Sequence, residues 1–211
     1  MKVLVVDDSV VFRSAIKSAL LSSDLVSEVE IAANGKIAID KLKANHFDSI
    51  TLDLEMPIMD GLETIKEIRK FNKDIPIIIF SAQNIKAANK TLEALQMGAD
   101  DFVSKIATAT NIDENLKMIE TELVPRFKAL VARKSKHIVK NTSPRTTSNS
   151  AGVNNFNPDI LCVASSTGGP DMLMKLFSGL QKLNIPMVIV QHMPPVFTTQ
   201  LAKTLDTLSP N

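Results

Sequence analysis

The sequence has few of the features that stabilise or anchor proteins outside the cell. Its 211 residues include one cysteine, Cys162, so no disulfide can form within the chain. Cys162 lies in the apolar run ILCVA and is expected to be buried. No apolar run approaches the ~18 residues of a membrane span, and the short apolar run of the N-terminus ends in two aspartates, unlike a signal peptide. We therefore expect a cytoplasmic protein without direct membrane insertion.

Acidic residues are missing from one stretch of the chain. Residues 123–158 contain seven basic residues and no acidic one, whereas residues 1–122 contain 14 basic and 20 acidic residues. The basic stretch is rich in Ser, Thr, Asn and Lys, and it has neither a nucleic-acid recognition motif nor more than two aromatic residues. We therefore predict a flexible basic linker over residues 123–158 and no binding of nucleic acid.

Residues 1–122 alternate short apolar runs with segments of helical periodicity. The runs KVLVV, VEIAA, SITLD, PIIIFSA and DFVSK are nearly continuous in apolar residues, as is typical of strands buried on both faces of a parallel sheet. A last helix is predicted from about Asn111 towards Leu130. The pattern predicts a complete α/β domain with five parallel strands.

Five polar residues end four of these strands. Asp7 and Asp8 follow the first strand, Asp53 ends the third, Ser81 ends the fourth and Lys105 ends the fifth. A single strand-end aspartate would usually be a helix cap, but ligands of open parallel sheets bind at these ends. Clustered carboxylates repel one another unless a cation such as Mg²⁺ joins them. The cluster predicts that Asp53 accepts a phosphoryl group whose oxygens Ser81 and Lys105 contact.

The motifs VDDS, LDLEMPIMDGLE, SA and GADDFVSK resemble the receiver domain of two-component response regulators. The resemblance implies a flavodoxin-like fold and phosphorylation of Asp53 by a histidine kinase. It also implies that Mg²⁺ binds Asp8, Asp53 and the backbone carbonyl of Glu55, with Asp7 acting through water.

The same resemblance implies that Ser81 and Phe102 rearrange on phosphorylation. In one respect the sequence departs from receivers, which usually have proline after the lysine that corresponds to Lys105. Here Ile106 follows, and a cis peptide bond before a residue other than proline costs ~2.5–4 kcal/mol. The geometry of this peptide bond, and with it the reach of Lys105, is left open.

Residues 159–211 contain two further strand–helix units. ILCVA and PMVIVQ read as strands, and PDMLMKLFSGL and PPVFTTQLAKTLDTL read as the helices that follow them. Two strands and two helices make a poor independent core at this length. The segment is therefore predicted to be the N-terminal fragment of a larger parallel α/β domain.

A glycine-rich corner, SSTGGPD, joins the first of these strands to its helix. A serine at such a corner can be a nucleophile whose oxyanion is stabilised by helix-terminal N–H groups. The alternative is a structural cap with a tight turn. His192 ends the next strand at the same sheet edge, where it can pair with a serine. The only carboxylate after His192, Asp206, is predicted to lie near the end of a helix, away from this edge.

The stretches ASSTGGPDML and QHMPPVFT resemble the start of the catalytic domain of chemotaxis protein-glutamate methylesterases, the CheB family. The resemblance spans nearly the whole chain, with the order receiver, linker, catalytic domain. It implies that Ser166 is the nucleophile and His192 the base, that no cofactor is needed at the hydrolytic site, and that the catalytic aspartate lies beyond residue 211.

The implied function is hydrolysis of glutamyl methyl esters on chemoreceptors, often with deamidation of receptor glutamines. The phosphodonor would be a chemotaxis histidine kinase, and the receiver would cover the active site until Asp53 is phosphorylated. The alternative is that the chain is truncated and acts only as a phosphoacceptor or binding module, with an inactive catalytic tail.

Overall fold

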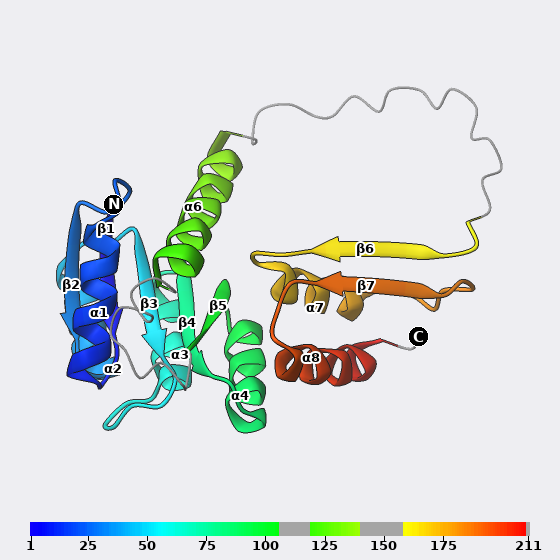
Figure 1. The fold of residues 1–211 in the computed structure, drawn as a ribbon, viewed down its shortest axis with the longest axis horizontal. Helices are drawn as coiled ribbons and strands as arrows, with labels where there is room; N and C mark the ends of the chain where they lie inside the picture. The colour runs from blue at the N-terminus through cyan, green and yellow to red at the C-terminus, as the bar shows by residue number, and fades with distance from the viewer. Residues whose placement is uncertain (106–118, 140–157, 210–211) are drawn as a thin grey trace.

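Figure 1 shows a computed structural model that describes residues 1–105, 119–139 and 158–209. Its first part is a parallel sheet with the strand order β2-β1-β3-β4-β5, which confirms the predicted flavodoxin-like fold. The strands are β1 (Lys2–Val6), β2 (Glu28–Ala32), β3 (Ser49–Asp53), β4 (Ile77–Ala82) and β5 (Asp101–Lys105), and the helices between them are α1 (Val10–Leu21), α2 (Gly35–Ala44), α3 (Gly61–Phe71) and α4 (Ile85–Gln96).

Polar caps begin these helices just beyond the carboxyl ends of the strands. The side chains of Asn34, Asp60 and Asn84 each accept a hydrogen bond from the backbone N–H three residues later, at 3.0, 2.9 and 2.9 Å. Such a cap satisfies a helix N–H that would otherwise lack a partner. The caps therefore fix where each helix starts around the edge of the sheet that carries the predicted site.

Apolar residues fill both faces of the central strands. On one face Leu4, Ile50 and Ile77 pack with residues of α2, α3 and α4. On the other, Val3, Val5 and Ile78 pack with α1. Full burial of one such side chain stabilises a fold by ~1.5–3 kcal/mol. This two-faced core holds the strand ends in fixed register.

The prediction of a flexible linker over residues 123–158 is wrong for the first part of this range. A π-helical turn, η1 (Ile119–Leu123), leads into α6 (Val124–Val139), and Leu123, Phe127 and Leu130 are buried in the same core as α1. These residues are spaced as one face of a helix, so they are held by apolar burial despite the basic composition. Neither α6 nor any other helix in the described ranges is long and apolar enough to cross a membrane. Residues 140–157 lie outside the described part.

The second part is a sheet of two parallel strands, β6 (Leu161–Ser165) and β7 (Met187–Gln191), with α7 (Gly169–Gly179) and α8 (Pro195–Leu208), as predicted. Both helices lie on one side of the strands (Figure 1). The expectation that Cys162 is buried is wrong, because Cys162 is exposed. Its neighbours on the uncovered face, Val188 and Val190, are 46% and 63% exposed.

The two parts share one core cluster. Helix α4 packs against both α7 and α8. The rings of Phe102 on β5 and Phe197 on α8 are stacked with their centroids 4.5 Å apart. Leu173, Met174 and Phe197 are buried in the same cluster as core residues of the first part, such as Leu4 and Ile50. The second part is thus held against β5 and α4 by apolar contact.

Candidate functional site

The predicted acidic cluster forms at the carboxyl edge of the first sheet. Carboxylate oxygens of Asp7, Asp8 and Asp53 all lie within 4.8 Å of one another. Asp7 and Asp53 are buried, and Asp8 is exposed. Strands β1 and β3 are adjacent and in register, which brings their end residues together. Three oxygen ligands at this spacing suit a hard cation, so the residues fit Mg²⁺.

Lys105 joins the cluster as predicted. Its Nζ lies 2.7 Å from Asp53 Oδ2 and 3.0 Å from Asp7 Oδ2. Burial lowers the pKa of Lys105, but the two carboxylates more than compensate, so its pKa is raised and the ammonium keeps its charge. Burial raises the pKa of Asp53, and Lys105 opposes this only in part. The Lys105–Ile106 peptide bond involves a residue outside the described ranges.

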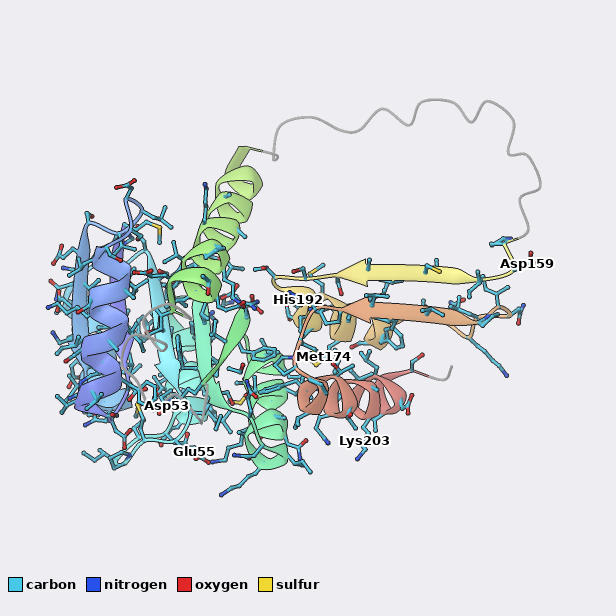
Figure 2. The ribbon with its side chains drawn as sticks, viewed as in Figure 1. Asp53, Glu55, Asp159, Met174, His192 and Lys203 are labelled. Carbon is cyan, nitrogen blue, oxygen red and sulfur yellow. The ribbon has the colours of Figure 1, made fainter. Side chains whose placement is uncertain are left out.

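A hollow of about 180 Å³ lies beside Asp53. Ser81 and Lys105 line it, together with Glu55 and Lys90. Lys90 Nζ lies 3.2 Å from the Glu55 carboxylate, and Figure 2 shows Glu55 just beyond Asp53. Sequence reasoning missed Lys90, because a lysine within a helix carries no signal of its own. The hollow places two cations around the space next to the Asp53 carboxylate.

The two predicted switch residues, Ser81 and Phe102, both contact helices at the junction of the first and second parts. The hydroxyl of Ser81 is hydrogen-bonded to that of Thr91, at 2.7 Å, and Thr91 is fully buried in α4. Phe102 is buried under Phe197 of α8. Sequence reasoning gave no role to Thr91 or Phe197, because both partners come from other elements.

The serine corner lies at the carboxyl edge of the second sheet. Ser165 and Gln191 end β6 and β7 in register, and the backbone N–H of His192 donates to the Ser165 carbonyl at 3.4 Å. Ser166 and His192 follow directly, and both are exposed. Figure 2 shows His192 where β7 ends, on the side that faces the first sheet. The sheet therefore places Ser166 and His192 at one edge, as predicted.

The side chains of Ser166 and His192 are not joined to each other. Among the described residues no hydrogen bond connects them, and none connects His192 to a carboxylate. Asp206 lines a hollow of about 670 Å³ between α7, β7 and α8, and Gln191 lines the same hollow. The hydroxyl of Ser165 donates to Gln191 Oε1 at 2.5 Å, whereas the hydroxyl of Ser166 has no such bond within the described ranges. Of the two serines, Ser166 therefore has its hydroxyl available.

Both halves of the sequence match known families. Residues 3–117 match the response regulator receiver domain, which covers more than half of the chain. The chain belongs to the response regulator receiver family. Behind the receiver, residues 161–211 match the CheB methylesterase family. We refer to residues 161–211, the part that matches this second family, as the CheB segment.

Two curated relatives span both parts. A protein-glutamate methylesterase/protein-glutamine glutaminase of Nocardioides is 38% identical over 97% of the chain, and that of Bacillus subtilis is 36% identical over 99%. The chain spans 58% and 60% of these relatives' lengths. Among solved structures, the response regulator domain of Thermotoga maritima CheB is 32% identical, with a TM-score of 0.55 over 63% of this chain and 96% of that one.

A buried carboxylate of the receiver reaches the serine corner of the CheB segment. Asp101 is 2% exposed and lies 3.1 Å from Arg126 Nη1. The backbone N–H of Gly168 faces this carboxyl and acts to lower its pKa. Burial raises the pKa of Asp101, and Arg126 opposes the shift. Gly168 has a φ of +70°, which favours glycine. Sequence reasoning assigned no role to Asp101 and placed Arg126 in a solvated linker.

Proposed function

We propose that the chain is the receiver-bearing part of a phosphorylation-regulated chemotaxis protein-glutamate methylesterase of the cytoplasm. The observation that carries the proposal is the serine corner: Ser166 and His192 follow paired strands at one sheet edge, against a receiver with an acidic phosphoacceptor cluster. The CheB match and the names of the relatives support the same activity. The substrates are glutamyl methyl esters of chemoreceptors, and glutamine side chains in deamidation.

In the receiver, Asp53 accepts the phosphoryl group from a phosphohistidine of a chemotaxis kinase. An Asp53 carboxylate oxygen bonds to phosphorus as the P–N bond breaks, and the imidazole leaves with a proton from solvent. Lys105, 2.7 Å from Asp53, stabilises the negative charge on the phosphoryl oxygens. Ser81 lines the hollow beside Asp53 in which this phosphoryl group would lie. Asp8, Asp53 and the Glu55 carbonyl would hold Mg²⁺, with Asp7 assisting through water, and the ion would neutralise further charge on the phosphoryl group.

In the CheB segment, Ser166 Oγ attacks the ester carbonyl carbon while His192 takes its proton. The C–O bond to methoxide then breaks, and methanol leaves with the proton from His192. Water activated by His192 cleaves the acyl-enzyme, which leaves a glutamate carboxylate and restores Ser166. Backbone N–H groups at the start of α7 are suited to bind the oxyanion.

Phosphorylation reaches the serine corner through the contacts between the two parts. In the unphosphorylated structure the Ser81 hydroxyl is hydrogen-bonded to the Thr91 hydroxyl, with 2.7 Å between the two oxygens. A phosphoryl group on Asp53 competes with Thr91 for this Ser81 hydroxyl. Phe102 then shifts beneath Phe197, and α8 moves with it. Gly168 moves away from Asp101 in the same change, which opens the corner to the receptor.

The alternative function, a phosphoacceptor with an inactive tail, is favoured by one observation. In the part of the chain that the structure describes, the hydrogen bonds of His192 go to Gln191 and Ser165 and none goes to a carboxylate. Removal of a triad acid typically costs ~10⁴-fold in kcat. We therefore expect slow hydrolysis by these 211 residues alone, and normal phosphorylation of Asp53.

Methanol release from methylated chemoreceptors tests the proposal. The wild-type chain should release methanol slowly, Ser166→Ala should release none above background, and Ser178→Ala should match the wild type. Ser178 is a suitable control because its hydroxyl bonds only within α7, to the Met174 carbonyl at 2.6 Å. Release that is equal in wild type and Ser166→Ala, or absent from both, favours the phosphoacceptor function instead.

A further inference from the structure

One amide side chain contacts both serines and the backbone of the histidine. Gln191 Oε1 accepts the hydrogen bond from Ser165 Oγ at 2.5 Å. Gln191 Nε2 lies 3.1 Å from the Ser166 carbonyl and 3.4 Å from the His192 carbonyl. An amide has two N–H donors and one oxygen acceptor, so these contacts use its capacity on both sides. The reversed amide would face two carbonyl oxygens with its own oxygen, so the network fixes the orientation of Gln191.

The corner is built to leave room for this amide. A Cβ atom at Gly169 would lie 2.1 Å from Gln191 Oε1 and 2.9 Å from Ser165 Oγ, so a side chain there collides with the network. The N–H of Gly169 also donates to the Ser166 carbonyl, at 2.7 Å. The carbonyl of Ser166 is therefore held by two donors, one from its own turn and one from β7.

We propose that Gln191 is a positioning residue for the nucleophile Ser166. Because Gln191 holds the Ser166 carbonyl, it sets the direction in which the Ser166 side chain points. Gln191 also links the serine corner to β7, the strand that His192 follows. The inference rests on the proposed hydrolytic function of Ser166. Gln191 acts through the backbone and touches no reacting atom. Its role follows from the need to hold reacting groups at ~3–3.5 Å, since a misplacement of ~1 Å costs ~100-fold in rate.

The variant Gln191→Glu separates positioning from packing. Glutamate has nearly the same shape and keeps an acceptor for Ser165, but it replaces the N–H donors by an oxygen that faces the Ser166 carbonyl. Gln191→Ala removes the whole network. The matched control is Gln96→Glu, the same chemical change at an exposed position near the end of α4.

The experiment combines three measurements on the full chain. Labelling of Ser166 by a fluorophosphonate, followed by mass spectrometry, reports how well the hydroxyl is placed. Both Gln191 variants should be labelled ~100-fold more slowly than the wild type, and methanol release should lose kcat with an unchanged KM. Amide hydrogen exchange at residues 167–169 should be about 2- to 10-fold faster, the effect of one net hydrogen bond. Gln96→Glu should match the wild type in every measurement.

The outcomes separate the two proposals. Gln191→Glu with wild-type exchange, or with faster exchange but wild-type labelling, overturns the role of Gln191. A wild-type chain that is neither labelled at Ser166 nor releases methanol contradicts the proposed function. In that case the rate of amide hydrogen exchange at residues 167–169, compared between the wild type and the Gln191 variants, still tests whether Gln191 holds the corner.

A second pair of variants tests the geometry directly. Gly169→Ala should slow labelling and lower the unfolding midpoint in the wild-type background, because its Cβ would meet Gln191 Oε1 at 2.1 Å. In the Gln191→Ala background the same change should have a much smaller effect, because that oxygen is gone. Equal effects of Gly169→Ala in both backgrounds contradict the proposed contact.

Discussion

Removal of the Phe197 ring probes the contact through which the receiver is proposed to reach the serine corner. Phe197 is 0% exposed and stacks on Phe102 with a centroid separation of 4.5 Å. Truncation of a buried phenylalanine to alanine costs ~3–5 kcal/mol. Stacking itself contributes ~0.5–1.5 kcal/mol of this beyond burial. Because α1, α6 and the face of β1 that carries Val3 and Val5 belong to a separate core cluster, the loss should fall on the cluster that joins α7 and α8 to the first sheet.

A double-mutant cycle isolates the stack. The free energy of unfolding is measured in urea for the wild type, Phe102→Ala, Phe197→Ala and the double variant. The double variant should lose ~0.5–1.5 kcal/mol less than the sum of the single losses. Phe71→Ala, at a 44% exposed position, should lose little. Losses that add within ~0.3 kcal/mol would refute the coupling of β5 to α8 through these rings.

Three further predictions concern carboxylates of the receiver. Mg²⁺ at ten times its Kd should raise the free energy of unfolding by about 1.4 kcal/mol. Thermal unfolding measures this gain, which Asp8→Asn should abolish and the control variant Asp40→Asn should keep. Asp53→Asn should gain no phosphoryl mass from acetyl phosphate and Mg²⁺, whereas Asp40→Asn should gain it; a phosphorylated Asp53→Asn would show another acceptor. Because burial raises the pKa of Asp101 above 3.8, the folded state binds its proton more tightly than the unfolded state does, so this group's contribution to stability falls as the pH rises above 3.8. The stability of the wild type minus that of Asp101→Asn, from urea midpoints, should therefore decrease over that range, and an increase would contradict the burial of the carboxylate.

Strand periodicity and the geometry of parallel sheets made the acidic cluster predictable. Apolar runs in the sequence indicate the strands, and neighbouring parallel strands place their carboxyl ends at one edge of the sheet. Asp7, Asp53 and Lys105 therefore meet without any knowledge of side-chain contacts. The same reasoning placed Ser166 and His192 at one edge of the second sheet.

Contacts between distant elements were not predictable in the same way. The approach of Gly168 to Asp101 and the stack of Phe102 on Phe197 depend on how two sheets dock, and no local pattern encodes that. Composition also misled: the basic residues of 123–158 led to a linker predicted from residue 123, although the helix predicted towards Leu130 already included Leu123 and Phe127, which are buried. Cys162 was expected to be buried because its strand is apolar on both faces, yet helices cover only one of them.

The rate of Ser166-dependent methanol release before and after phosphorylation of Asp53 tests the central claim most directly. The release is measured from methylated chemoreceptors with and without acetyl phosphate and Mg²⁺, with Ser166→Ala subtracted as background. The account predicts that phosphorylation raises the rate in the wild type and leaves Asp53→Asn unchanged. A Ser166-dependent rate that is the same with and without phosphorylated Asp53 would contradict it.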